Sequence, residues 1–330
     1  MPTDKLRWGV LGVAHINERL LPAFRKCAHA ELRAIASRSA ERAQAAAAAA
    51  GIPVAHGSYQ ALLDDPTVDA VYVPLPNTLH AEWTRAAADR GKHVLCEKPL
   101  TPTAAEARDL VAHCAARGVR LLDGFMWPHH PRTARIRALI DQGDIGEVRR
   151  VNGAFTFRLA PNPANIRYQA DKAGGSLLDV GCYPVYAIRW AFGAEPARAF
   201  AVARYQFDVD AELAAVLTFA DGRTASFDCG FTQPYRGWLE IVGSEALIQV
   251  PMMWLPPPDA PFIVRRDGRE PETITVPGHD QIVCMLDGFS RAVLRGEPVR
   301  PSPEEAVRTL AVLDAVAASA RQGRAVDVAG

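Results

Sequence analysis

The chain has 330 residues, with 37 basic and 37 acidic side chains and a hydrophobic content of 49%. This length allows two domains of ordinary size, each with its own core. The balanced charge argues against a nucleic-acid or anionic-membrane surface, and no run of eighteen apolar residues occurs that would span a bilayer.

The N-terminal sequence MPTDKLRWGVLG enters a strand-like pattern directly, so we expect no signal peptide. The six cysteines lie far apart, none in a C-x-x-C pair, and several fall inside apolar runs. This usage is typical of reduced core thiols and predicts a cytoplasmic protein without disulfides or zinc ligands.

Up to about residue 127, short apolar β-type runs alternate with helical stretches. The predicted strands cover 6–12, 31–38, 69–76, 92–99 and 119–127, with helices at 16–28, 39–50, 78–90 and 103–117. This alternation predicts an α/β domain over residues 1–127, with a doubly wound parallel sheet covered by helices on both faces.

After about residue 147, long β-type segments fold back at Asp-Gly or Gly-Ser turns, which predicts antiparallel hairpins. Helices are predicted at about 176–191 and 303–322, and the proline-rich stretch 251–261 is predicted to be a loop. The second domain, 128–330, is therefore α+β and mainly antiparallel, and its last helix could pack back toward the first domain.

The first chemical motif follows the first predicted strand, in GVLGVAHINERLLPA. A strand, a glycine turn and a helix N-terminus in this order can hold a pyrophosphate. Compared with G-x-G-x-x-G, Gly12 is present, whereas Ala14 and Asn17 replace the second and third glycines. The alternative is that the glycines only make a tight turn.

The second motif is ASRSAER, at the end of the second predicted strand. A carboxylate here typically binds the ribose of NAD, whereas NADP requires cations for its 2′-phosphate. Ser37 and Arg38 occupy this place and Arg42 follows one helical turn later, which favours NADP(H) over NAD(H), although NAD(H) stays possible. The alternative is a solvated helix start.

Two further strand ends are expected at the same edge of the sheet. In VPLPNTLH, Asn77 and His80 could face the nicotinamide ribose, or Asn77 could cap a helix and His80 could lie on the surface. In CEKP, Glu97 and Lys98 emerge beside the expected nicotinamide site, and the bond from Lys98 to proline could be cis. A solvated lysine is the alternative.

The stretch GGSLLDVGCYPV supplies candidates for proton transfer. Asp179 and Tyr183 are four residues apart and would share one face of a helix, while Gly181 and Pro184 predict a local distortion of that helix. Tyr183 would be the acid–base group, Lys98 would favour its phenolate, and Asp179 would orient the substrate or the lysine.

Structural alternatives exist for both side chains. Asp179 could simply pair with Arg189 or Lys172, and Tyr183 could be a half-buried core aromatic. The adjacent histidines 129 and 130 lack a third ligand at a usual spacing, so no metal site is predicted.

Together, GVLGVAHIN, ASRSAERA, VPLPNTLHAEW, GKHVLCEKPLT and GGSLLDVGCYPV closely resemble the glucose–fructose oxidoreductase/inositol dehydrogenase (Gfo/Idh/MocA) superfamily. The resemblance implies an N-terminal Rossmann domain, a C-terminal domain with a large open antiparallel sheet, NAD(P) binding, and a homodimer or homotetramer formed through the outer face of that sheet. It also places Lys98 and Tyr183 at the catalytic lysine and acid–base positions.

The tyrosine and the Ser-Arg pair look most like the NADP-using branch with aldose dehydrogenases, dihydrodiol dehydrogenases and deoxysugar ketoreductases. The predicted cofactor contacts are Gly12, Ala14, His15, Ile16, Ser37, Arg38, Arg42, Leu75, Asn77, His80, Glu97, Lys98 and Arg167. The predicted substrate contacts are Trp127, His129, Tyr186, Gln233 and His279, with His130 and Trp238 as further candidates for the sugar cleft.

The sequence therefore predicts an NADP-dependent oxidoreductase that moves a hydride between nicotinamide and a carbinol or carbonyl carbon of a sugar. Two alternatives stay open from the resemblance: a glycosidase that oxidises its sugar transiently with a tightly held NAD, and a non-catalytic NADP-sensing regulator.

Overall fold

The computed structural model describes residues 5–329. The chain forms two compact units: the first runs to His129 and includes Asp280–Ala306, and the second comprises His130–His279 and the chain from Val307. The segment Asp280–Ala306, which the sequence placed in the second domain, thus belongs to the first unit. The prediction about the N-terminal leader concerns residues that lie partly outside the described range.

The first unit is built on a six-stranded parallel sheet in the order β3-β2-β1-β4-β5-β6. Its strands are β1 (Leu6–Leu11), β2 (Ala30–Ala36), β3 (Val54–His56), β4 (Ala70–Val73), β5 (His93–Cys96) and β6 (Leu121–Asp123). Its helices are α1 (Asn17–Phe24), α2 (Ala40–Ala50), α3 (Tyr59–Leu63), α4 (His80–Ala88), α5 (Ala104–Ala116) and α8 (Gln281–Leu294), with short 3-10 turns η1 (Asn77–Leu79) and η2 (Trp127–His129). The predicted doubly wound sheet is confirmed.

Local chemistry explains where the helices of this unit begin and end. Ser39 and Thr103 accept hydrogen bonds from the backbone N–H three residues on, which caps α2 and α5. Gly51, Gly91 and Gly118 follow helices with positive φ angles, as the sequence predicts. Every residue of the central strand β4 is buried, as expected for a sheet covered on both faces.

Helix α8 packs against the start of the same sheet. Its Ser290 hydroxyl accepts a 3.0 Å hydrogen bond from the Trp8 indole, and Phe289 contacts the same ring. Asp287 accepts hydrogen bonds from the backbone and ring of His29. These contacts explain why α8, far along the chain, completes the core of the first unit.

The second unit is built on a nine-stranded sheet in the order β14-β13-β12-β11-β7-β10-β9-β8-β15, in which only the β7–β10 pair is parallel. The strands are β7 (Val148–Arg158), β8 (Arg198–Gln206), β9 (Val209–Thr218), β10 (Thr224–Gly230), β11 (Thr232–Gly243), β12 (Ala246–Val250), β13 (Ala260–Arg266), β14 (Glu272–Val276) and β15 (Val326–Asp327). This confirms the predicted, mainly antiparallel sheet.

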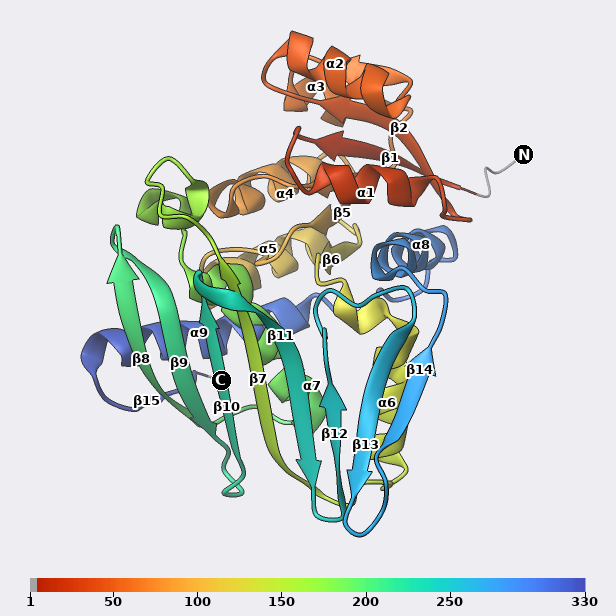
Figure 1. Ribbon diagram of the computed structural model, residues 1–330. Coiled ribbons are helices and arrows are strands. Elements are labelled where there is room, and N and C mark those ends of the chain that lie inside the picture. Colours follow the sequence, from red (N-terminus) through yellow and green to blue (C-terminus); the bar gives the residue numbers. More distant parts are fainter. Residues whose placement is uncertain (1–4, 330) are drawn as a thin grey trace. The chain divides into compact units, whose positions relative to one another are not determined.

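Helices α6 (Pro131–Asp141), α7 (Cys182–Phe192) and most of α9 (Glu304–Gln322) lie on one side of this sheet (Figure 1). Short turns η3 (Ile166–Tyr168), η4 (Ala170–Lys172) and the π-helical turn η5 (Leu177–Gly181) connect β7 to α7. The predicted loop at 251–261 is observed as far as the start of β13.

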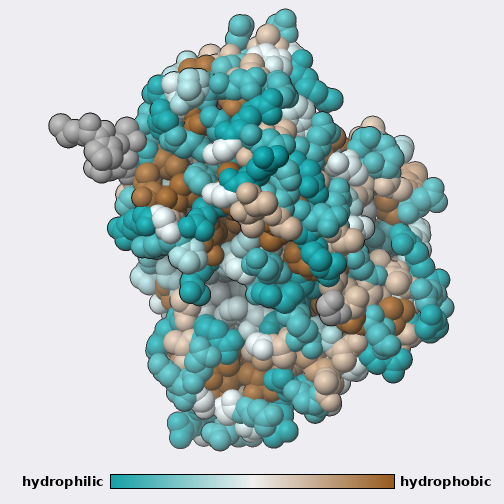
Figure 2. Space-filling view, turned by 180° about the vertical axis from the view of Figure 1, so that it is seen from behind, coloured by the Kyte–Doolittle hydropathy of each residue, from teal (hydrophilic) through white to brown (hydrophobic). Residues whose placement is uncertain are grey.

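Along the strands of the nine-stranded sheet, exposed and buried residues alternate, as in β8 and β9. The exposed side chains point to the face opposite the helices. Figure 2 shows the side turned away from the viewer in Figure 1, opposite to this outer sheet face, and that side is mainly hydrophilic, with hydrophobic residues in separate small groups. Within residues 5–329, no helix is both long and apolar enough to cross a bilayer.

Candidate active site

The glycine turn after β1 has the shape of a dinucleotide cradle. Gly12 has a φ of +131°, and a Cβ placed there would come within 3.1 Å of the Leu75 side chain. Asn17, the first residue of α1, donates a 2.8 Å hydrogen bond from its side-chain amide to the Gly12 carbonyl. Asn17 thus anchors the turn where the motif has its third glycine, and His15 stands exposed beside it.

The end of β2 brings hydroxyl groups and cations together. Ser37 is buried and accepts a hydrogen bond from the Ser39 N–H, whereas Arg38 and Arg42 are exposed. The Arg42 guanidinium reaches the Val13 carbonyl at 3.4 Å, so it lies at the glycine turn. This arrangement fits a ribose with a 2′-phosphate.

His80 connects two loops at the carboxyl edge of the parallel sheet. Its ring is fully buried, with Nδ1 2.8 Å from the Pro99 carbonyl and Nε2 2.7 Å from the Leu75 carbonyl. Burial is the main cause that lowers the pKa of this imidazole. This geometry corrects the expectation that His80 faces a bound cofactor, because backbone carbonyls already occupy both ring nitrogens.

The neighbouring Asn77 begins the turn η1. The N-cap positions of this turn and of helix α4 are taken by Pro76 and Leu79, and neither side chain makes a capping hydrogen bond. The contact of Asn77 with a cofactor stays a prediction.

Glu97 and Lys98 emerge from β5, as the sequence predicts, and both are partly exposed. The Tyr72 hydroxyl donates a 2.5 Å hydrogen bond to Glu97 Oε1, and the Lys98 backbone N–H lies 3.3 Å from Glu97 Oε2. The peptide bond between Lys98 and Pro99 is cis. Glu97 is thus fixed from β4, and Lys98 leaves the sheet next to it.

Asp123, the last residue of β6, is a feature that the sequence analysis did not single out. It pairs in register with Cys96, and the next N–H, that of Gly124, donates a 2.7 Å hydrogen bond to the Cys96 carbonyl. Asp123 Oδ1 is buried and has no hydrogen-bond partner among the described residues. Burial first, and then the charge of Glu97, raise the pKa of this carboxyl well above its usual value. The sequence signal that could have identified Asp123 was an acidic residue near the end of the strand that lies next to the strand leading into CEKP.

In the second unit, the predicted distortion before Tyr183 is observed. Residues 177–181 form a π-helical turn, and α7 begins directly after it at Cys182. Asp179 lies in the π-turn and Tyr183 in the first turn of α7, so the two do not share one regular α-helical face. Such π-turns frequently occur at functional sites.

Asp179 forms an ion pair with Arg167, whose Nε lies 2.7 Å from Asp179 Oδ2. The Asp179 charge is the main cause that raises the pKa of the Arg167 guanidinium. Arg189 instead pairs with Glu195, and Lys172 with Asp171. The structure therefore replaces the two partners that the sequence suggested for Asp179 with Arg167.

The Tyr183 ring is held by two aromatic neighbours in the second unit. It lies edge-on to Phe155 at 5.1 Å between ring centroids, and 5.7 Å from the ring of Trp254. The Trp254 indole donates a 2.8 Å hydrogen bond to the Ala154 carbonyl, which fixes the loop that follows β12. Tyr183 itself stays partly exposed on a mostly buried helix, so its ring is positioned while the side chain can still be reached.

Arg132 holds the same loop from α6. The buried guanidinium donates to the carbonyls of Pro251, Met252, Met253 and Pro261 at 3.0–3.5 Å. Burial lowers the pKa of Arg132 to about 10. This residue was not predicted from the sequence, because its partners are backbone atoms of a loop more than a hundred residues away.

The predicted substrate residues have different environments. Trp127 and Tyr186 are buried, His279 is exposed beside the His130 ring at 6.0 Å, and burial lowers the pKa of His129 to about 4. Gln233 lines a depression on the outer sheet face together with Val202 and Ala214, and Trp238 lines the adjacent one. This placement corrects the expectation for Gln233 and Trp238, because the helix with Tyr183 covers the other face.

Each unit thus gathers one group of candidate residues. The first unit brings together the glycine turn, the Ser37–Arg42 segment, Glu97 and Lys98, and the second brings together Arg167, Asp179 and Tyr183. Among the described residues, no group of three or more His, Cys, Asp or Glu side chains is arranged to hold a metal ion.

Comparison with known proteins places this chain in a family. Residues 6–125 match the family model described as "Oxidoreductase family, NAD-binding Rossmann fold", and residues 133–249 match the GFO/IDH/MocA C-terminal domain. D-xylose 1-dehydrogenase (NADP(+)) 2 of Haloferax volcanii is 39% identical over 98% of this chain and all of its own length.

A second relative, the dTDP-3,4-didehydro-2,6-dideoxy-alpha-D-glucose 3-reductase of Actinomadura kijaniata, is 39% identical over 96% of both chains. The crystal structure of KijD10, a 3-ketoreductase from Actinomadura kijaniata with NADP and TDP-benzene, superposes with a TM-score of 0.88 at 38% identity, over 96% of this chain and 98% of its own. The chain belongs to the GFO/IDH/MocA family of NAD-binding oxidoreductases.

Proposed function

We propose that the protein is an NADP-dependent oxidoreductase that interconverts a CH–OH group and a carbonyl group of a carbohydrate. The observation that carries this proposal is the Arg167–Asp179 ion pair on the π-turn before Tyr183, because it fixes a carboxylate one turn away from a reachable phenol. The relatives support the reaction class, since the two described above are a sugar dehydrogenase and a keto-sugar reductase.

The first unit would hold the cofactor. The glycine turn and the N-terminus of α1 would bind the pyrophosphate, and Ser37, Arg38 and Arg42 would bind the 2′-phosphate. When bound, NADPH supplies a hydride to a carbonyl carbon, and NADP+ accepts one from a carbinol. His15, Ile16, Leu75, Asn77 and Glu97 stay predicted contacts of the cofactor, as does Arg167.

Tyr183 would exchange the proton at the substrate oxygen, while Lys98 contributes a positive charge at that oxygen. A nearby ammonium favours the phenolate form of a tyrosine, whose unperturbed pKa is about 10, and so brings proton transfer closer to neutral pH. Asp179, held by Arg167, would orient the substrate hydroxyl or the lysine. Lys98 and Tyr183 belong to different units, and their joint action is part of this proposal.

A screen of aldoses, inositols and keto-sugars with NADP+ and NADPH tests the function directly, through the absorbance of the reduced nicotinamide. We expect turnover with at least one sugar class, and its loss in Lys98→Met. Failure of every substrate with both cofactors, while Lys98→Met still binds NADP normally, would contradict the oxidoreductase proposal. Cofactor that survives purification without net turnover would instead favour the NAD-dependent glycosidase.

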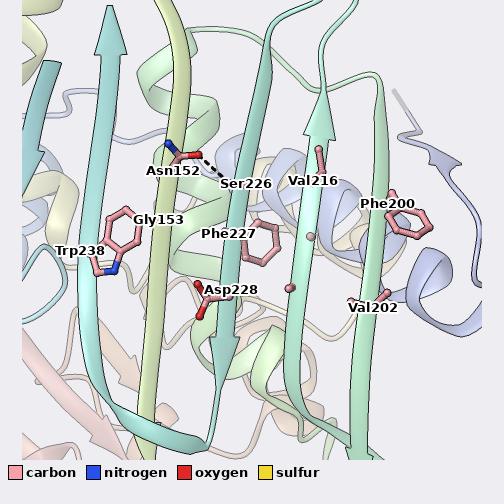
Figure 3. Close-up of a pocket in the computed structure, with 11 residues that line it drawn as sticks. Asn152, Gly153, Phe200, Val202, Val216, Ser226, Phe227, Asp228 and Trp238 are labelled. Atoms are coloured by element: carbon pink, nitrogen blue, oxygen red, sulfur yellow. Dashed lines mark hydrogen bonds between the residues drawn. The ribbon is translucent and has the colours of Figure 1, made fainter. Parts of the chain in front are cut away.

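We further propose that two copies of the chain associate through the outer face of the nine-stranded sheet. Phe200, Val202 and Val216 are 45%, 58% and 43% exposed on neighbouring strands, around a depression of about 340 Å³ that Trp238 also lines (Figure 3). Contiguous apolar side chains of this kind favour a protein interface.

A cytoplasmic location, inferred from the cysteine pattern, stays a prediction.

A further inference from the structure

The π-turn with Asp179 begins at a carboxylate from a distant strand. Asp210 on β9 accepts a 2.6 Å hydrogen bond from the Leu177 N–H and a 2.8 Å hydrogen bond from the Ser176 hydroxyl, both at Oδ2. Ser176 stands at the N-cap position, yet its own side chain caps no backbone N–H. Asp210 therefore takes over the capping role and places its carboxyl group at the N-terminal end of the turn.

Two glycines make this approach possible. Gly175 has a φ of +112°, and a Cβ on it would clash with Asp210 Oδ1. A Cβ on Gly174 would come within 2.6 Å of the Arg167 carbonyl oxygen. The pair thus admits the carboxylate on one side and the backbone of Arg167 on the other.

The same segment ties Arg167 to the helix twice. The Arg167 carbonyl accepts a 2.9 Å hydrogen bond from the Gly175 N–H, and its guanidinium pairs with Asp179. The Asp179 N–H in turn donates to the Gly175 carbonyl at 3.1 Å. Asp210 therefore holds the point from which both members of the Arg167–Asp179 pair are positioned.

The surroundings make this cap strong. Ser176 is fully buried, and its hydroxyl also lies 3.6 Å from the Cys229 thiol. Asp210 itself is half-buried, and burial raises the pKa of its carboxyl. Hydrogen bonds in such low-dielectric surroundings are stronger than in water, and costly to lose.

We propose that Asp210 is a positioning residue of the active site, which fixes the π-turn and through it the direction of Asp179 and Tyr183. The inference rests on the proposed function, because it assigns Asp210 to the proton-transfer step. Asp210 lies in the second unit, whereas the glycine turn and the Ser37–Arg42 segment lie in the first. It is therefore expected to act on kcat more than on the affinity for NADP.

Kinetics of Asp210→Asn and Asp210→Ala test the proposal at a saturating concentration of the sugar found in the screen. We expect kcat to fall about 10- to 100-fold in Asp210→Ala, as displaced catalytic groups cost rates of this order. Asp210→Asn keeps one oxygen that can accept the Leu177 hydrogen bond, so its loss should be smaller. The matched control is Asp208→Asn, at an exposed position with a φ of 66° that asparagine tolerates.

Two measurements separate positioning from a merely structural role. Hydrogen exchange of peptides over 174–183 should be faster in Asp210→Ala, because the Leu177 N–H loses its acceptor. The titration of Tyr183 should also shift, measured as the absorbance difference between each protein and its Tyr183→Phe counterpart. A fall in kcat that only follows the loss of folded protein, with an unchanged Tyr183 titration, would overturn the proposal.

Other outcomes are equally decisive. Unchanged kcat in Asp210→Ala despite faster exchange would overturn the positioning role and leave the oxidoreductase function standing. A wild-type protein without turnover on any sugar would instead refute the proposed function. The Tyr183 titration needs no substrate, so in that case its insensitivity to Asp210→Ala would still overturn the positioning role.

Discussion

The guanidinium of Arg167 donates a 2.7 Å hydrogen bond to the carboxylate of Asp179, and thereby joins the loop after β7 to the π-turn before Tyr183. The two side chains are 41% and 18% exposed, so the pair is too accessible to water to contribute much stability. Its value therefore lies in geometry, because it gives one direction to Asp179, the carboxylate that we propose orients the substrate hydroxyl or the lysine.

Arg167→Gln should lower kcat about tenfold or more, since misdirected catalytic groups cost activity of this order, while the midpoint of thermal unfolding stays nearly unchanged. Steady-state kinetics and differential scanning fluorimetry measure the two quantities. Arg167→Lys is the control, because it keeps the charge but loses the planar fork, and it should be intermediate. An Arg167→Gln protein with wild-type kcat would show that the pair is only a surface contact.

Lys98→Met and Tyr183→Phe should each lower kcat by about 10²–10⁴-fold, the range typical of a missing acid–base partner. Both variants should still bind NADP, since the glycine turn and the end of β2 are untouched. If the two residues act on one oxygen, the double variant should be little worse than the worse single variant. Fully additive losses would indicate that they act in separate steps.

The strand–helix order of the first unit followed from sequence because each element carries a local signal. The caps at Ser39 and Thr103 and the glycines with positive φ are examples, and so is Lys98 at its strand end. The short elements β3 and α3 were not predicted, although Ser58 caps α3 in the same way. Helix α8 was not predicted, even though its apolar residues have helical spacing. Its place in the first unit could not be predicted either, because its partner Trp8 lies 282 residues away.

The candidate site was predictable only where a motif names its residues. Asp179 and Tyr183 lie in such a motif, and Gly181 and Pro184 gave warning of the π-turn. The partner of Asp179 was not predictable, because three basic side chains, Arg167, Lys172 and Arg189, lie near it in the sequence and only the fold selects Arg167. Supports such as Asp210 and Arg132 act through backbone atoms, so no residue pattern reports them.

Cofactor preference should depend on the two arginines after β2. Arg38→Ala is expected to lower kcat/KM for NADP about 10- to 100-fold, as expected for a lost charge-assisted contact of about 1.5–3 kcal/mol, and to leave kcat/KM for NAD nearly unchanged. The control is Arg108→Ala, at an exposed position of α5. Equal losses with both cofactors would show that Arg38 does not contact the 2′-phosphate.

Association through the sheet can be tested at its most exposed apolar residue. Val202→Asp should convert the oligomer to monomers in size-exclusion chromatography with light scattering, because a buried unpaired carboxylate is costly at an interface. Leu294→Asp, which changes a 40% exposed leucine on α8, should leave the mass unchanged. A wild-type protein that is monomeric would show that there is no such interface. A Val202→Asp protein that stays oligomeric would place the interface elsewhere.

Asp123 lies near the strand end that carries the proposed catalytic Lys98. Its carboxyl group should make the stability of the folded protein depend on pH. Its pKa in the folded protein is raised well above the usual value, first by burial and then by Glu97. The folded state therefore holds the proton more tightly than the unfolded state. The resulting stabilisation is complete below the unfolded pKa, about 3.9, and is lost as pH rises through the folded pKa.

Asp123→Asn removes this titration, so its midpoint of thermal unfolding should rise relative to wild type as the pH increases from 4 toward 8. Each unit of pKa difference corresponds to about 1.4 kcal/mol in the free energy of unfolding. Asp123→Glu keeps a carboxyl group and should follow the wild-type trend. A constant difference between wild type and Asp123→Asn across this range would mean that the carboxyl at the end of β6 ionises as freely in the folded protein as in the unfolded chain. Asp123 would then not make the thermal stability of the protein depend on pH in this range.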